Sequence, residues 1–133
     1  MKNLSLLLFS FFLMNTVLAQ DIPNLSEMQP PAEYDNIHVE KLSSDERASC
    51  FVIWVKEKVA AHRHETHSES VYVLEGTGTM TLGDRSFTFK KGDYIYIPIN
   101  TVHAVEVTSE NAVQVLSIQA PEFLGKDRVF QED

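Results

Sequence analysis

The stretch that decides the fold reads HRHETHSESVYVLEG and runs from His62 to Gly76. His62 and His64 are two residues apart, so on an extended strand both imidazoles point to the same face. Glu69 follows after a short polar segment, and an apolar run then leads to the glycine. Two imidazoles and a carboxylate that are brought together in this way suit a divalent transition metal. We therefore take His62, His64 and Glu69 as candidate metal ligands, with His103, in a later strand-like segment, as the fourth.

Short segments of strand composition lie on both sides of this stretch, and turn residues separate them. Gly83-Asp84 stands between two alternating runs and predicts a β-hairpin. We expect an edge strand near 37–42 and further strands near 50–56, 59–64, 71–74, 79–82, 85–90, 94–97, 103–107 and 112–118. Eight or nine short strands without a helix after the first residues predict an all-β fold, an antiparallel sandwich or barrel.

Length and composition exclude several classes of protein. At 133 residues, 44% hydrophobic and 23% charged, the chain has the size and composition of one globular domain. Its formal net charge of −8 argues against nucleic acid or an anionic membrane as a partner. Cys50 is the only cysteine, so an internal disulfide is excluded, and we expect its side chain to be a small buried one.

The first 19 residues have the pattern of a secretory signal peptide. Lys2 gives a basic start, an apolar run follows, and small residues precede a cleavage point between Ala19 and Gln20. The apolar run is shorter than the roughly 20 residues that a membrane-spanning helix needs. We therefore expect a periplasmic or secreted protein that has no membrane contact after cleavage.

At this point the residues resemble a known family, the cupins. The first cupin motif has the pattern His-x-His, four residues, Glu, six residues, Gly, and it is met by His62, His64, Glu69 and Gly76. The positions of the second motif are occupied by Gly92, Pro98, Asn100, His103 and Val107. Only residues 77–91 separate the two motifs, as in compact single-domain (type 2) cupins.

Three positions depart from the family pattern. Lys56 replaces the glycine that opens the first motif, Asn100 stands for a glycine, and Val107 stands for an asparagine. Asparagine tolerates a positive φ better than most residues, so the change at Asn100 is mild. None of the three is a metal position of the family.

The resemblance implies a fold, a set of segments and a site. The fold is a double-stranded antiparallel β-helix, or jelly-roll barrel. We expect a signal peptide at 1–19, an N-terminal arm at 20–36, the barrel at 37–120 and an extended tail at 121–133. The implied metal ligands are His62, His64, Glu69 and His103, a nitrogen and oxygen set that suits Fe, Mn, Ni, Co, Cu or Zn and disfavours calcium.

The side chains near the ligands are expected to divide by parity. Val71 and Val73 share the parity of Glu69, and Val105 shares that of His103, so these valines should line the barrel beside the metal. Arg63 should face outward. His67 is an alternative ligand, a residue at the mouth that meets substrate, or a solvated loop residue, and we favour the last interpretation.

Three functional hypotheses remain open at this stage. The first is a metal-dependent enzyme with dioxygenase-like or isomerase-like chemistry on a small-molecule substrate. The second is a non-catalytic cupin module that binds a small ligand or a metal. The third is an empty structural or interaction barrel. The resemblance also raises the expectation of a homodimer, to which the arm at 20–36 would contribute.

Overall fold

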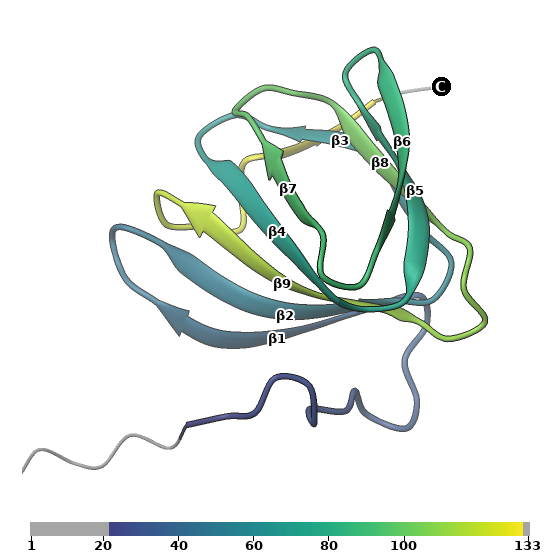
Figure 1. Cartoon of the computed structure of the whole chain (residues 1–133). Helices are drawn as coiled ribbons and strands as arrows, with labels where there is room; N and C mark the ends of the chain where they lie inside the picture. The colour runs from purple at the N-terminus through teal and green to yellow at the C-terminus, as the bar shows by residue number, and fades with distance from the viewer. Residues whose placement is uncertain (1–21, 132–133) are drawn as a thin grey trace, which may run out of the picture.

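Ten strands form two five-stranded antiparallel sheets in the part of the chain that the computed structural model describes, residues 22–131. The signal peptide that we expect at 1–19 lies outside this range. Sheet A has the order β1-β2-β9-β4-β7 and sheet B the order β10-β3-β8-β5-β6. The sheets face each other around a common interior, as Figure 1 shows. This architecture confirms the all-β, double-stranded β-helix fold.

The strand bounds follow the sequence pattern closely. The hairpin predicted at Gly83-Asp84 joins β5 to β6, and β1 is an edge strand as expected. Sheet A contains β1 (Ile37–Ser44), β2 (Ser49–Val55), β9 (Val113–Ala120), β4 (Ser68–Glu75) and β7 (Tyr94–Ile97). Sheet B contains β10 (Arg128–Phe130), β3 (Lys58–His64), β8 (His103–Val107), β5 (Thr77–Leu82) and β6 (Arg85–Lys90).

The C-terminal segment differs from the extended tail that we expected. Residues 128–130 form β10, which pairs with β3 and places Arg128 opposite His64 and Phe130 opposite His62. This strand becomes the edge of sheet B, next to the two histidines of the first motif. The last described part of the chain therefore borders the candidate site.

The interior is packed by side chains that alternate along the strands. On β4, Val71 and Val73 are buried, whereas Tyr72 between them is exposed. Together with β5, β6, β7 and β9 they form the core cluster, whose buried members are Val71, Val73, Met80, Phe89, Ile95, Ile97, Val113 and Val115. Burial of such side chains contributes roughly 25 cal/mol per Å² of apolar surface, which makes this cluster the main source of stability.

Several other side chains can be placed in the structure. Trp54 is buried, whereas Tyr72, Tyr94 and Tyr96 lie exposed on the outer face of sheet A. Cys50 is only partly buried. The described part of the N-terminal arm passes below sheet A (Figure 1), and the side-chain amide of Gln114 donates a hydrogen bond to the Leu25 carbonyl. Within residues 22–131, no helix is long and apolar enough to cross a bilayer.

Candidate metal centre

Three strands carry the candidate ligands to one end of the interior. His62 and His64 lie at the end of β3, Glu69 lies on β4, and His103 is the first residue of β8. A register shift between β3 and β8, after the pair of Val59 and Val105, places His62 directly opposite His103. Such bulges re-aim side chains. Here the shift brings two imidazoles together across the sheet.

The four side chains are buried and close to one another. One nitrogen from each of the three imidazoles lies within 4.8 Å of the others. Glu69 Oε2 is 3.5 Å from His64 Nε2 and 3.8 Å from His103 Nε2. Each of the four residues exposes less than a tenth of its surface. The structure therefore brings all four predicted side chains into one cluster.

Two of the imidazoles are oriented by backbone carbonyls. His62 Nδ1 lies 2.8 Å from the Ala60 carbonyl, and His103 Nδ1 lies 3.0 Å from the Thr101 carbonyl. In the neutral tautomer that donates from Nδ1, the Nε2 lone pair is free to bind a metal. His64 Nε2 is buried and has no hydrogen-bond partner among residues 22–131. A buried nitrogen without a partner is costly, and a cation would satisfy it.

Glu69 is held by two polar side chains that the sequence interpretation missed. Ser117 donates a short hydrogen bond to Glu69 Oε1, and Gln119 Nε2 approaches the same oxygen at 3.4 Å. Both residues are buried on β9, in the alternation that otherwise places Val113 and Val115 in the core. The sequence signal that could have identified them is the presence of two polar residues at positions of β9 that face the core.

The pKa shifts favour the protonation states that metal binding requires. Burial, with the neighbouring His103, lowers the pKa of His62 to about 4, and burial also lowers the pKa of His103. Burial by itself raises the pKa of the Glu69 carboxyl, but the side chains of His64, Ser117 and His103 outweigh it and lower this pKa to about 2. At neutral pH His62 and His103 are thus neutral and Glu69 is ionised, the forms that bind metal.

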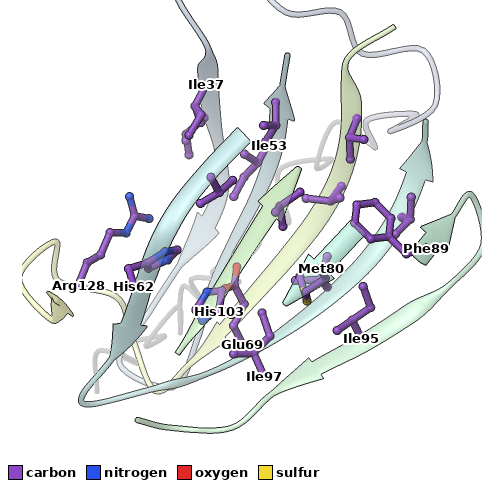
Figure 2. A pocket seen from close by; sticks show the side chains of 18 residues that line it. Ile37, Ile53, His62, Glu69, Met80, Phe89, Ile95, Ile97, His103 and Arg128 are labelled. Carbon is purple, nitrogen blue, oxygen red and sulfur yellow. The ribbon is translucent and has the colours of Figure 1, made fainter. Parts of the chain in front are cut away.

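A cavity of about 100 Å³ opens beside the cluster. His62, Glu69 and His103 line it, and Figure 2 shows them near Met80 and Ile97. Val71, Val73 and Val105 also line this cavity, which confirms the parity prediction, whereas Arg63 lies outside it and pairs with Glu65 on the surface. The remaining lining side chains are apolar, except for Arg128.

His67 does not behave as the solvated loop residue that we favoured, and that expectation is wrong. It is almost completely buried and stacks on His64, with ring centroids 4.2 Å apart. His67 Nδ1 lies 2.7 Å from Asp127 Oδ2, at ion-pair distance although without aligned hydrogen-bond geometry. A polar sequence context suggested exposure, but the C-terminal segment covers this residue, a contact that local pattern cannot reveal.

Comparison with known proteins assigns the family. The cupin domain family matches residues 49–119, more than half of the 133-residue chain, and this range contains all four clustered residues. The chain belongs to the cupin family. Asn100, the residue that replaces a motif glycine, has a φ of 60°, a left-handed conformation that asparagine tolerates better than most residues.

Curated relatives resemble this cupin over part of its length. An uncharacterised protein of Methanocaldococcus jannaschii is 38% identical over 76 residues, which cover 57% of this chain and 61% of that protein. Quercetin 2,3-dioxygenase of Bacillus subtilis is 36% identical over 53 residues, which cover 40% of this chain and 16% of the enzyme. The chain thus spans less than two thirds of either relative.

Solved structures share the fold at low sequence identity. An uncharacterised double-stranded β-helix protein of Klebsiella pneumoniae aligns with a TM-score of 0.72 at 16% identity, covering 86% of this chain and all of that one. Oxalate decarboxylase of Bacillus subtilis, described with Mn(II) centres, aligns with a TM-score of 0.65 at 22% identity, covering 77% of this chain and 30% of the enzyme. These similarities establish the fold.

Proposed function

We propose that this protein is an exported metal-binding cupin that acts as a small-molecule metalloenzyme. The observation that carries the proposal is the cluster of three imidazoles and one carboxylate, of which His62, His103 and Glu69 line an apolar cavity. His62, His64, His103 and Glu69 would hold a divalent transition metal. Bound there, such an ion supplies Lewis-acid or redox chemistry.

The residues of the chain define what kind of substrate fits. The cavity is small, and its walls beyond the ligands are apolar, so it suits a small, largely apolar molecule with an oxygen group that can reach the metal. The apolar walls exclude water from the cluster and strengthen electrostatic interactions inside it. Arg128 at the cavity edge adds one positive charge, which favours a substrate with a single anionic group.

The relatives support a reaction class and no more. Similarity to quercetin 2,3-dioxygenase favours dioxygenase-like chemistry. A mannose-1-phosphate guanylyltransferase of Salmonella typhimurium also matches, at 29% identity over 17% of its length, so the relatives do not share one reaction. Isomerase-like chemistry stays in the proposal as the alternative that the family resemblance implies.

A non-catalytic ligand-binding module is the second candidate. Among the residues that line the cavity, the ionisable ones are His62, Glu69, His103 and Arg128. Three of these four are candidate metal ligands, so the lining of the cavity offers no separate imidazole or carboxylate as a general acid or base. Stoichiometric binding of a ligand that is recovered unchanged would favour this module over the enzyme.

The experiment that tests the proposal is elemental analysis of the protein purified without a histidine tag. We expect close to one transition-metal ion per chain, lost in the His62→Ala/His103→Ala double variant. His38→Ala is the matched control, because His38 lies on β1 outside the cavity and should leave the metal content unchanged. A wild-type protein that takes up no added divalent metal would exclude the metalloenzyme.

Export is a separate part of the proposal and rests on residues 1–19. Expression of the full chain in a Gram-negative host, followed by cell fractionation and N-terminal sequencing, tests it. We expect periplasmic protein that begins at Gln20. Full-length protein confined to the cytoplasm would contradict export while leaving the metal centre untouched.

A further inference from the structure

The C-terminal segment brings a carboxylate to the outer side of His64. Asp127 immediately precedes β10, and its Oδ1 lies 3.5 Å from His64 Nδ1 while its Oδ2 lies 2.7 Å from His67 Nδ1. All three residues are buried. Asp127 lies beyond residues 49–119, the range that the cupin family matches.

His64 differs from the other two imidazoles in what faces its Nδ1. His62 and His103 each have a backbone carbonyl there, at 2.8 and 3.0 Å. His64 Nδ1 has no aligned hydrogen-bond partner in the described chain, and the Asp127 carboxylate occupies the facing position. If Nε2 of each imidazole binds the metal, each Nδ1 carries a proton and needs an acceptor. Asp127 Oδ1, 3.5 Å from His64 Nδ1, is the carboxylate oxygen that faces this nitrogen.

The carboxylate is held in place by several groups. Thr66 donates to Asp127 Oδ2 from its hydroxyl at 2.9 Å and from its backbone N–H at 3.3 Å. The Glu65 N–H donates to the Asp127 backbone carbonyl at 3.2 Å. The Phe123 ring packs edge-on against His64 and His67, with centroid distances of 6.4 and 5.5 Å. Asp127 is therefore fixed by its surroundings and can in turn fix His64.

A second metal ion held by His64, His67 and Asp127 is the competing interpretation. Their ligand atoms lie within 4.8 Å of one another. However, the His64 and His67 rings stack at an interplanar angle of 30°, and imidazole lone pairs lie in the ring plane, so stacked rings aim poorly at one ion. The 2.7 Å between His67 Nδ1 and Asp127 Oδ2 is shorter than the roughly 3.3 Å between two ligands of a tetrahedral zinc.

We propose that Asp127 is a positioning residue that accepts a hydrogen bond from the Nδ1–H of His64 and so orients this imidazole toward the metal. The C-terminal segment is then part of the metal centre. The inference rests on the proposed function, because it assumes that His64 Nε2 binds an ion. Such carboxylate–histidine–metal arrangements typically change metal affinity 10- to 100-fold when the carboxylate is lost.

The test compares Asp127→Asn with the wild type and with Asp93→Asn. Asparagine keeps the shape and one acceptor oxygen but loses the charge. Asp93 is the matched control because its carboxylate also accepts a backbone N–H, that of Lys90 at 2.8 Å, and it does not line the cavity. The dissociation constant for Zn(II) is measured with a competing chelator, and the absorption spectrum of the Co(II)-loaded protein reports ligand geometry.

We expect Asp127→Asn to bind one Zn(II) per chain about 10- to 100-fold more weakly and to change the Co(II) spectrum. Asp93→Asn should match the wild type in both measurements. If Asp127→Asn does not fold, Thr66→Val removes only the hydroxyl that anchors the carboxylate, and we expect a smaller loss of affinity, on the order of five-fold.

Three results would overturn the inference. Unchanged Zn(II) affinity and an unchanged Co(II) spectrum in Asp127→Asn would remove the role of Asp127 and leave the metal centre intact. Two ions per wild-type chain, falling to one in Asp127→Asn, would establish the second metal site instead. A wild-type protein without any bound metal would overturn the proposed function and this inference together.

Discussion

The two ends of the barrel interior use the same strands but opposite kinds of side chain. On β4, Glu69 points to the polar end, where the four candidate ligands lie. Val73, four residues later on the same face, packs at the apolar end. On β9, Ser117 supports Glu69, whereas Val113 packs in the core cluster. Both ends follow one inward–outward alternation, so a change of residue type at constant parity is enough to convert core into site.

The polar end tolerates the charge of Glu69 because this carboxylate has partners there. The Glu69 carboxylate accepts hydrogen bonds from Ser117 and Gln119 and lies near two imidazoles. Around Val73 the neighbours are apolar side chains such as Met80 and Ile95, which can neither donate hydrogen bonds nor carry charge. A charge at the apolar end would therefore be buried without compensation.

The largest expected effect comes from a charge placed at the apolar end. Val73→Glu should lower the free energy of unfolding by about 4 kcal/mol or more, because Val73 is fully buried. Tyr72→Glu is the matched control: this neighbour is 44% exposed on the opposite face, and we expect a loss of about 1 kcal/mol or less. Urea unfolding of the metal-free variants measures both. Equal losses would show that the two faces of β4 do not differ as described.

The strands and the side chains that face the interior could be predicted from local pattern, whereas the jelly-roll fold and the four-residue cluster followed from the resemblance to the cupin motifs. The expected strand at 103–107 coincides with β8, and the alternation of Val71 and Val73 identified the lining of the cavity. The spacing of His62 and His64 was sufficient to place both on one face of β3.

The remaining features depend on contacts between distant segments. The register shift that sets His62 opposite His103 is a property of strand pairing, which alternation within β3 does not encode. β10 is three residues long, too short for a periodic signal, and its pairing with β3 spans about 60 residues of sequence. Asp127 and the burial of His67 follow from that pairing, so both were missed.

The second largest expected effect is a loss of stability in acid. It tests the polar end of the interior, because the titrating groups lie there and not at the apolar end. In the metal-free protein, burial and His103 lower the pKa of His62 from 6.5 to about 4. Between these pH values His62 is protonated in the unfolded chain but not in the folded chain. The free energy of unfolding therefore falls by on the order of 2 kcal/mol as the pH drops from 6.5 to 4. Glu69, whose pKa is lowered from 4.5 to about 2, adds a further loss between pH 4.5 and 2.

Urea unfolding of the metal-free protein at pH 7, 5.5 and 4.5 measures this dependence. His62→Gln should flatten the part between pH 6.5 and 4, because the variant has no imidazole to protonate at this position. His38→Gln, which removes a histidine of β1 from outside the cavity, is the control and should keep the wild-type dependence. An identical pH dependence in wild type and His62→Gln would contradict the assignment of the loss of stability in acid to the polar end.

The smallest effect on stability is expected from a substitution of Arg128, at the edge of the cavity. Arg128 lines the cavity from β10, and its guanidinium carbon lies 6.0 Å from the centre of the Phe123 ring. Arg85 on β6 has a similar arrangement, 5.9 Å from the Phe87 ring, but lies outside the cavity. Comparing variants of Arg128 and Arg85 therefore separates the effect of an arginine on anion binding in the cavity from its effect on the surface.

We expect Arg128→Gln to change the free energy of unfolding by no more than about 0.5 kcal/mol, because the side chain is exposed. In the zinc-loaded protein it should weaken butyrate binding about five-fold, the loss of one partly exposed ion pair, and leave binding of the neutral butyramide unchanged. Arg85→Gln should alter neither ligand. Calorimetric titration measures the affinities. Equal butyrate affinity in wild type and Arg128→Gln would show that the cavity selects its ligand by the metal and the apolar wall alone.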